Sequence, residues 1–209
     1  MGVETEIKVR VGNPEQFLER LRSLKPILLT ERHFEDNFVL DFAGRRLASM
    51  QCLLRIRIAN GSALLTFKGP PRPSGLFKIR EELESSAADG KALLTIFKRL
   101  GLRLSFRYQK YRREFKVISS PGRSGEIHVV LDETPIGTFA EFEGSEAGIR
   151  KVAQTMGFRR TQFLRESYAA LYVEFCRKRN QPVRHMTFRP VRNASARRRA
   201  PASKRKDES

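Results

Sequence analysis

Three pairs of glutamates, each separated by one residue, are the first feature of this sequence that could carry chemistry. They are Glu4 and Glu6, Glu82 and Glu84, and Glu141 and Glu143. Side chains alternate faces along a β-strand, so both members of a pair share a face wherever the segment is a strand. Two carboxylates that close repel each other unless a cation lies between them. Carboxylate oxygens are the ligands that Mg2+ and Mn2+ prefer, and the three pairs therefore indicate a divalent-metal site.

Basic residues recur with the same alternation and supply the opposite charge. They are Lys8, Arg55, Arg57, Lys68, Lys78, Arg80, Lys110 and Arg112. Guanidinium groups bind phosphate through two donors, so this set suits a polyanion that bears several phosphates. A solvated face of an antiparallel strand explains any one of these segments equally well. Because the pattern recurs on several segments, a metal ion together with a polyphosphate is the one class of ligand that satisfies both sets.

Strands must position these side chains. From residue 4 to residue 10 the even positions are charged, whereas the odd positions are mostly apolar, which predicts a strand over 2–11. Asn60-Gly61 is a hairpin signal between two further alternating runs, 53–58 and 62–68. Hairpin connections and strict alternation favour antiparallel pairing. The remaining strands are predicted at 33–41, 77–83, 105–117, 126–132 and 137–143.

Helices are predicted between or beside these strands, at 13–25, 87–100, 146–156 and 167–178. The first has an Asn13 cap followed by Pro14 at the first helical position. An open sheet with a charged face on nearly every strand would be unusual, whereas a closed barrel points all of these faces into one lumen. The sequence therefore predicts an α+β fold, an eight-stranded antiparallel β-barrel with flanking helices.

Composition restricts the choices further. The 209 residues are enough for one domain with a hydrophobic core. The apolar runs are too short to cross a membrane, and the N-terminus lacks the layout of a signal peptide. Cys52 and Cys176 lie far apart without metal-ligand spacing, and the scattered histidines are typical of structural or exposed positions. We therefore expect a cytoplasmic protein with two buried, reduced thiols and no membrane partner.

The net charge of +18 is unevenly distributed. From Arg177 to Ser209 there are twelve Lys and Arg and two acidic residues, a net charge of +10 that leaves +8 on residues 1–176. The C-terminal segment cannot bury enough apolar surface to fold alone, so we expect a folded domain over 1–176 and a disordered basic tail over 177–209. This tail could contact nucleic acid or another polyanion through counterion release, or serve only solubility.

Short motifs follow one another along residues 1–176. They are Glu4-x-Glu6-x-Lys8, Leu54-Arg55-Ile56-Arg57, Thr66-Phe67-Lys68-Gly69-Pro70, Arg80-Glu81-Glu82-Leu83-Glu84, Lys110-Tyr111-Arg112-Arg113, Leu131-Asp132-Glu133, the run from Ile136 to Glu143, and Ser167-Tyr168. In order and spacing they resemble the CYTH domain, the family of triphosphate tunnel metalloenzymes. The resemblance implies an eight-stranded antiparallel tunnel that holds a triphosphate in a basic lumen, with a divalent metal at the acidic pairs.

The resemblance also implies roles for individual residues. Those that would bind the phosphates are Lys8, Arg55, Arg57, Lys68, Arg80, Lys110 and Arg112. Those that would hold the metal are Glu4, Glu6, Asp132, Glu141 and Glu143, with Glu82 and Glu84 as further ligands or their partners. The metal would neutralise charge on the phosphates and orient a water or a ribose hydroxyl for attack. Crowding by other cations would lower the pKa of Lys8 and make it a catalytic base.

Two classes of function remain open. The first is an enzyme that hydrolyses inorganic triphosphate or an organic one such as thiamine triphosphate, or that cyclises ATP to cyclic AMP as class IV adenylyl cyclases do. Phe34 and Phe38 stand in a region where family members often carry tyrosine, so water activation assisted by tyrosine is not predicted. The second is a non-catalytic polyphosphate- or nucleotide-binding module tethered to RNA by its tail. Intact metal ligands favour the enzyme, and the sequence does not indicate an oligomeric state.

Overall fold

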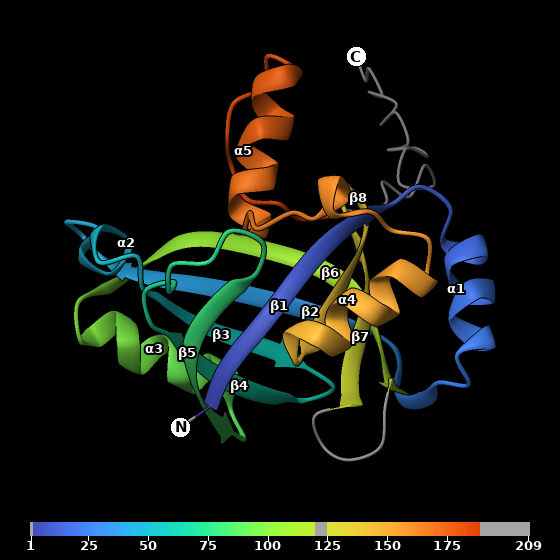
Figure 1. The fold of residues 1–209 in the computed structure, drawn as a ribbon. Coiled ribbons are helices and arrows are strands. Elements are labelled where there is room, and N and C mark those ends of the chain that lie inside the picture. The colour runs from blue at the N-terminus through green and yellow to red at the C-terminus, as the bar shows by residue number, and fades with distance from the viewer. Residues whose placement is uncertain (1, 120–124, 189–209) are drawn as a thin grey trace, which may run out of the picture.

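Eight antiparallel strands close into a barrel in the computed structural model, which describes residues 2–119 and 125–188 (Figure 1). The strand order around the barrel is β1-β5-β4-β3-β2-β6-β7-β8. The fold class predicted from the sequence is confirmed. The strands are β1 (Gly2–Val11), β2 (Ile27–Phe42), β3 (Leu53–Ala59), β4 (Ser62–Lys68), β5 (Lys78–Ala87), β6 (Leu102–Ile118), β7 (Glu126–Thr134) and β8 (Gly137–Gly144).

β1 crosses the front of the barrel in Figure 1 and pairs with both β5 and β8. Its alternation sorts the side chains: Ile7 belongs to the hydrophobic core outside the barrel, while Glu6 and Lys8 line the cavity inside it. Glu6 is directly opposite Glu143, and Lys8 is directly opposite Glu141. This register brings the acidic pairs of β1 and β8 together.

The longer helices are α1 (Pro14–Ser23), α3 (Gly90–Arg99), α4 (Glu146–Thr155) and α5 (Tyr168–Lys178). The first three lie against the outside of the barrel, whereas α5 projects away from it (Figure 1) and its first residues, Tyr168 and Ala169, line the cavity. α4 packs on β1, β7 and β8, whereas α3 packs on β3, β4 and β6. α1 begins where predicted because Pro14 occupies the first turn and the Asn13 side chain accepts a hydrogen bond from the backbone of the helix. None of the helices within residues 2–119 and 125–188 has the length and apolar character that crossing a bilayer requires.

The structure differs from the prediction at β2, at the short helix α2 (Arg46–Ser49) and at a single turn of 3-10 helix, Arg160–Gln162, which was not predicted. β2 begins at Ile27 rather than at residue 33, because register shifts on both sides of Thr30 interrupt the alternation on which the prediction relied. The short helix α2 was not predicted either. Its N-terminus is capped by the carboxylate of Asp41, which accepts hydrogen bonds from the amides of residues 47 and 48.

Two segments cover strand edges that would otherwise stay unpaired. Leu164 exchanges backbone hydrogen bonds with Lys8 of β1, and Met186 does so with residues 107 and 109 of β6. Met186 is buried. The predicted domain boundary after residue 176 therefore needs correction, since α5 continues to Lys178 and the following segment packs on the barrel. The rest of the predicted tail, 189–209, lies outside the described residues.

Candidate functional site

The barrel encloses a cavity of about 700 Å3. Every residue predicted to bind phosphate lines it, and so does every predicted metal ligand except Asp132. Asp132 has none of its surface exposed, because Lys110, Arg112 and Tyr168 contact its carboxylate. Alternation along the strands thus gathers into one lumen residues that are far apart in the sequence.

Basic and acidic side chains of this lumen pair with each other on the side formed by β1, β4 and β5. The ammonium of Lys68 contacts Glu4 and lies 3.2 Å from an oxygen of Glu82. Lys78 pairs in the same way with Glu6. The sequence analysis assigned the compensation of both sets to a metal ion and a polyphosphate, but these lysines already pair with carboxylates of the lumen. A ligand must therefore replace some of these ion pairs when it binds.

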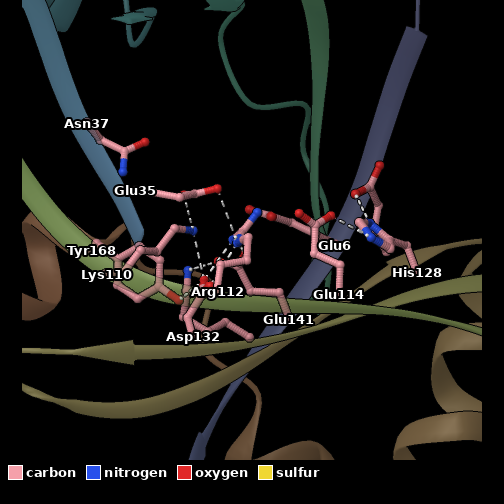
Figure 2. Close-up of polar contacts among 12 residues, drawn as sticks. Glu6, Glu35, Asn37, Lys110, Arg112, Glu114, His128, Asp132, Glu141 and Tyr168 are labelled. Atoms are coloured by element: carbon pink, nitrogen blue, oxygen red, sulfur yellow. Dashed lines mark hydrogen bonds and ion pairs between the residues drawn. The ribbon is translucent and has the colours of Figure 1, made fainter. Parts of the chain in front are cut away.

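Asp132 is the centre of a second network, drawn in Figure 2. Its Oδ2 accepts hydrogen bonds from Lys110 at 2.9 Å, from Arg112 at 2.7 Å and from the Tyr168 hydroxyl at 2.7 Å. Its Oδ1 accepts a further hydrogen bond from Arg112 at 2.8 Å. Both oxygens are engaged, so the contacts of Asp132 suit the orientation of Lys110 and Arg112 better than direct binding of a metal.

Lys8 differs from its predicted chemistry. Burial disfavours the charged ammonium, but Glu141 and Glu6 outweigh burial and raise the pKa of Lys8. Its Nζ lies 3.1 Å from Glu141 Oε1, donates to the carbonyl oxygen of Glu166 at 3.1 Å, and sits 4.4 Å above the Tyr168 ring. The predicted lowering of its pKa was wrong, because its nearest charges are carboxylates rather than other cations.

Arg55 lies in a third group of contacts, between β3, β4 and β6. It donates hydrogen bonds to the hydroxyl of Tyr108 at 3.2 Å and to that of Thr66 at 3.0 Å, and Thr66 donates to Glu84 at 2.8 Å. Burial alone would raise the pKa of Tyr108, but Arg55 and Lys110 lower it. A tyrosine hydroxyl is thus present in the lumen, on β6 rather than on the β2 segment that contains Phe34 and Phe38.

Arg80, unlike the other predicted phosphate-binding arginines, donates its hydrogen bonds to backbone carbonyl oxygens in the described residues. Its guanidinium donates to the carbonyl oxygens of Gly69 at 2.6 Å and Lys68 at 3.3 Å, and to that of Gln51. These bonds tie β5 to the end of β4 and to the turn before β3. Arg80 therefore has fewer donors available for a ligand than its position alone suggested.

The acidic residues of β1 and β5 fit a divalent metal. Burial, together with the charges of Glu6 and Glu82, raises the pKa of Glu4 to about 8, although Lys68 opposes the shift. The raised pKa of Glu4 means that Lys68 does not fully compensate the negative charge of the neighbouring carboxylates. A divalent cation would relieve this excess, and hard carboxylate oxygens suit Mg2+ or Mn2+.

His128 and Glu114 also line the lumen, although neither was predicted to do so. His128 Nε2 lies 3.0 Å from Glu114, and its Nδ1 lies 3.7 Å from Glu143. The neighbouring carboxylates of Glu114 and Glu143 raise the pKa of His128 to about 9, so its imidazolium lies as a cation between two carboxylates. The alternation of side chains could have identified both residues. Glu114 lies two residues after Arg112 and His128 lies four residues before Asp132, so each shares a strand face with a predicted site residue.

A further group of potential metal ligands comprises His33, Glu35 and Glu114, whose ligand atoms lie within 4.8 Å of one another. Glu35, however, already faces Arg57 at 3.4 Å and Arg112 at 3.9 Å. A metal ion here would be added to a cluster of cations, which makes this group a poorer metal site than the acids of β1 and β5.

The lining of the cavity is apolar where β2, β3 and β6 approach α2. Val39 is directly opposite Phe106, and Leu53 and Cys52 lie beside the same part of the cavity. Phe106 stacks on Tyr108 with ring centroids 5.9 Å apart. Cys52 is only half-buried, unlike the predicted buried thiol, whereas Cys176 is buried as predicted.

Comparisons with known proteins agree with this arrangement. Residues 2–169 match the family model of the CYTH domain. The chain is 25% identical over 180 residues to a protein of Methanocaldococcus jannaschii named as a candidate adenylate cyclase, a match that covers 81% of this chain and 98% of that one.

Solved structures share the fold. A candidate adenylate cyclase from Vibrio parahaemolyticus matches with a TM-score of 0.66 and 23% identity, over 79% of this chain and 94% of that one. A candidate adenylyl cyclase from Hippeastrum, described as having a dominant triphosphatase activity, matches with a TM-score of 0.56 and 19% identity, over 86% of this chain and 97% of that one.

Proposed function

Because the chain belongs to the CYTH domain family, we propose that it is a divalent-metal-dependent enzyme that acts on a triphosphate. The observation that carries this proposal is the lumen of the barrel, in which acids suited to a metal lie beside bases suited to phosphates. A metal ion can bind the carboxylates of these ion pairs while the triphosphate binds their basic side chains. An anion without a metal would leave the acids unpaired.

Seven basic residues form the proposed phosphate-binding set: Lys8, Arg55, Arg57, Lys68, Arg80, Lys110 and Arg112. Arg55 presents its guanidinium to the cavity, while Lys110 and Arg112 are oriented by Asp132. Such fixed cations stabilise charge that spreads over phosphate oxygens during transfer.

Six glutamates form the proposed metal-binding set: Glu4, Glu6, Glu82, Glu84, Glu141 and Glu143. Asp132, included on the family resemblance, is proposed to act through the bases that it orients. When bound, Mg2+ or Mn2+ would neutralise charge on the phosphates and orient the attacking oxygen.

Lys8 is the proposed catalytic residue. With its raised pKa it is charged at neutral pH, so it would donate a hydrogen bond or a proton to a phosphate oxygen rather than remove a proton from the nucleophile. Its position between Glu141 and the Tyr168 ring fixes the direction of its ammonium.

The proposed substrates are inorganic triphosphate, thiamine triphosphate and ATP. Hydrolysis needs water as the nucleophile, whereas cyclisation of ATP needs the ribose hydroxyl. The apolar lining around Val39, Leu53 and Phe106 gives room for an organic group attached to the triphosphate, and this favours the two organic substrates.

Purified protein incubated with each substrate and Mg2+ or Mn2+ tests the proposal, with products separated by chromatography. Cyclic AMP from ATP would identify a cyclase, and free phosphate without a cyclic product would identify a triphosphatase. Glu4→Gln is the control, because it removes one proposed metal ligand and should abolish either activity. Tight triphosphate binding without turnover would instead support the non-catalytic binding module.

A further inference from the structure

Glu35 of β2 is a buried carboxylate that belongs to neither the proposed metal-binding set nor the phosphate-binding set. It is 1% exposed, does not itself line the cavity, and lies on the side of Lys110 and Arg112 away from Asp132 (Figure 2). Its oxygens are 3.4 Å from Arg57, 3.4 Å from Lys110 and 3.9 Å from Arg112. All three belong to the proposed phosphate-binding set.

The contacts of Glu35 differ from those of Asp132, which faces Lys110 and Arg112 from the other side. Asp132 is held by hydrogen bonds of 2.7 to 2.9 Å. The contacts of Glu35 with the three cations are longer, and its Oε2 has no hydrogen-bond partner among the described residues. Asp132 therefore orients the cations through directed bonds, whereas Glu35 acts on them mainly through its charge.

Hydrogen-bond donors without acceptors lie near the cations that Glu35 faces. Among the described residues, Asn37 Nδ2 and Arg55 Nε are buried without an acceptor. Asn37 Oδ1 accepts a hydrogen bond from Arg57 Nε at 3.4 Å, so the amide nitrogen is the unpaired side of this buried side chain. Buried donors normally have partners, and Arg55 lines the cavity, so its free Nε leaves capacity for an anion there. The charge of Glu35 opposes that anion.

We propose that Glu35 is a specificity-determining residue whose fixed charge disfavours a free triphosphate and so makes binding depend on an accompanying divalent metal. The inference rests on the proposed function. A fixed anion repels a ligand in proportion to the ligand's net negative charge. Each bound divalent ion removes two units of that charge, so the metal complex is repelled less than the free triphosphate.

Binding of inorganic triphosphate, measured by calorimetry in EDTA and again in Mg2+, tests this role without turnover. Glu35→Gln removes the charge with little change of shape. We expect at least about tenfold tighter binding in EDTA and a clearly smaller gain in Mg2+, because even two unit charges about 10 Å apart at an effective dielectric of about 20 interact by more than a tenfold change in affinity requires. Glu35→Asp keeps the charge and should retain the wild-type dependence on metal.

Asp36→Asn is the matched control. Asp36 is the next residue of the same strand but is held on the outside of the barrel by Arg107, at 2.6 and 2.9 Å. Removing its charge should leave both affinities unchanged. Thermal unfolding checks that each variant is folded, and Glu35→Met provides a second uncharged variant should the glutamine variant not fold.

The outcomes separate the inference from the function on which it rests. Weaker or unchanged binding by Glu35→Gln in EDTA, or an equal gain in EDTA and Mg2+, would overturn the role of Glu35 while leaving the triphosphate enzyme intact. A wild-type protein that binds triphosphate under neither condition would overturn the proposed function and the inference together.

Discussion

Asp132 and Glu4 are both carboxylates of the barrel, but their surroundings give them different tasks. Asp132 accepts four hydrogen bonds from three basic or hydroxyl-bearing side chains. Glu4 has a single basic contact, Lys68, and faces other acids. One is therefore suited to orienting cations, and the other to exchanging its lysine for a metal ion.

Replacing Asp132 by asparagine should destabilise the protein strongly. The change leaves Lys110 and Arg112 buried with one compensating charge fewer, and breaking a buried ion pair in this way costs about 3–5 kcal/mol. The free energy of unfolding in urea measures the effect. Asp36→Asn, which breaks a partly exposed pair, should cost about 0–1 kcal/mol. Similar losses in the two variants would contradict the central position of Asp132.

Lys8→Arg tests the proton-donating role of Lys8. Arginine keeps the positive charge beside Glu141 and the Tyr168 ring but holds its proton far more firmly. If Lys8 transfers a proton, kcat should fall by about 100-fold or more, while affinity for the metal–triphosphate complex changes less. Turnover equal to that of the wild type would exclude Lys8 from proton transfer.

The buried charge of Glu35 makes a prediction for stability against pH. Burial alone would raise its pKa, but Lys110, Arg112 and Arg57 outweigh burial and lower it. A carboxyl whose pKa is lower in the folded protein stabilises the fold above its unfolded pKa of about 4.3, and this contribution is lost as pH falls. The charged and titratable groups that face it are Arg55 and Arg57 of β3, Lys110, Arg112 and Glu114 of β6, and His33 of β2.

Unfolding of the wild type and of Glu35→Gln should be compared from pH 3 to pH 8. We expect the wild type to be more stable by a constant margin above about pH 5, and the margin to shrink below about pH 4.3. A margin that stays the same between pH 3 and pH 7 would mean that the carboxylate charge does not contribute.

At the scale of elements, the alternation of apolar and charged residues predicted those strands that have one face packed on the core and the other face lining the lumen. β1 is the clearest example, since Ile7 and Val9 are buried outside while Glu6 and Lys8 point inward. The start of β2 could not be found in this way, because its register is irregular there. Glu35 was missed for a related reason, since polar residues occupy both faces of that strand.

Pairing between side chains could not be predicted from the sequence at all. Alternation showed which residues face the lumen, but that Lys68 meets Glu4 depends on β5 lying between β4 and β1. The register of a closed barrel fixes such contacts, and a single sequence does not specify it. The predicted pKa of Lys8 was wrong for this reason, since its neighbours were unknown.

The segment after α5 provides a prediction at the same scale. Met186 is 1% exposed and packs in the cluster that contains Tyr108 and Tyr168. Met186→Ala should lower the free energy of unfolding by about 2–5 kcal/mol, as expected for a buried methionine. Val183→Ala, at a position that is 53% exposed, should change it little. Equal effects would mean that the segment does not pack on β6.

At the scale of the whole molecule, one part of the charge lies in the barrel and another part lies in the C-terminal sequence after residue 188. Inside the barrel, acids and bases compensate each other in close pairs. Residues 189–209 carry eight Lys and Arg and two acids, a net charge of +6 that leaves +12 on the rest of the chain. The charges inside the barrel suit one small ligand, and those after residue 188 suit a polyanion of any sequence.

A chain that ends at residue 188 should therefore separate the two properties. It keeps the barrel, α5 and Met186, so turnover of the triphosphate and the unfolding midpoint should match those of the full chain. Its affinity for single-stranded RNA should fall, and the dependence of log K on log salt should become less steep by about 0.7 for each RNA phosphate that the removed segment neutralises. Fluorescence anisotropy at a series of salt concentrations measures this slope. A slope unchanged by the truncation would assign any RNA binding to the barrel surface, whereas an inactive truncated chain would show that the basic segment serves the tunnel itself.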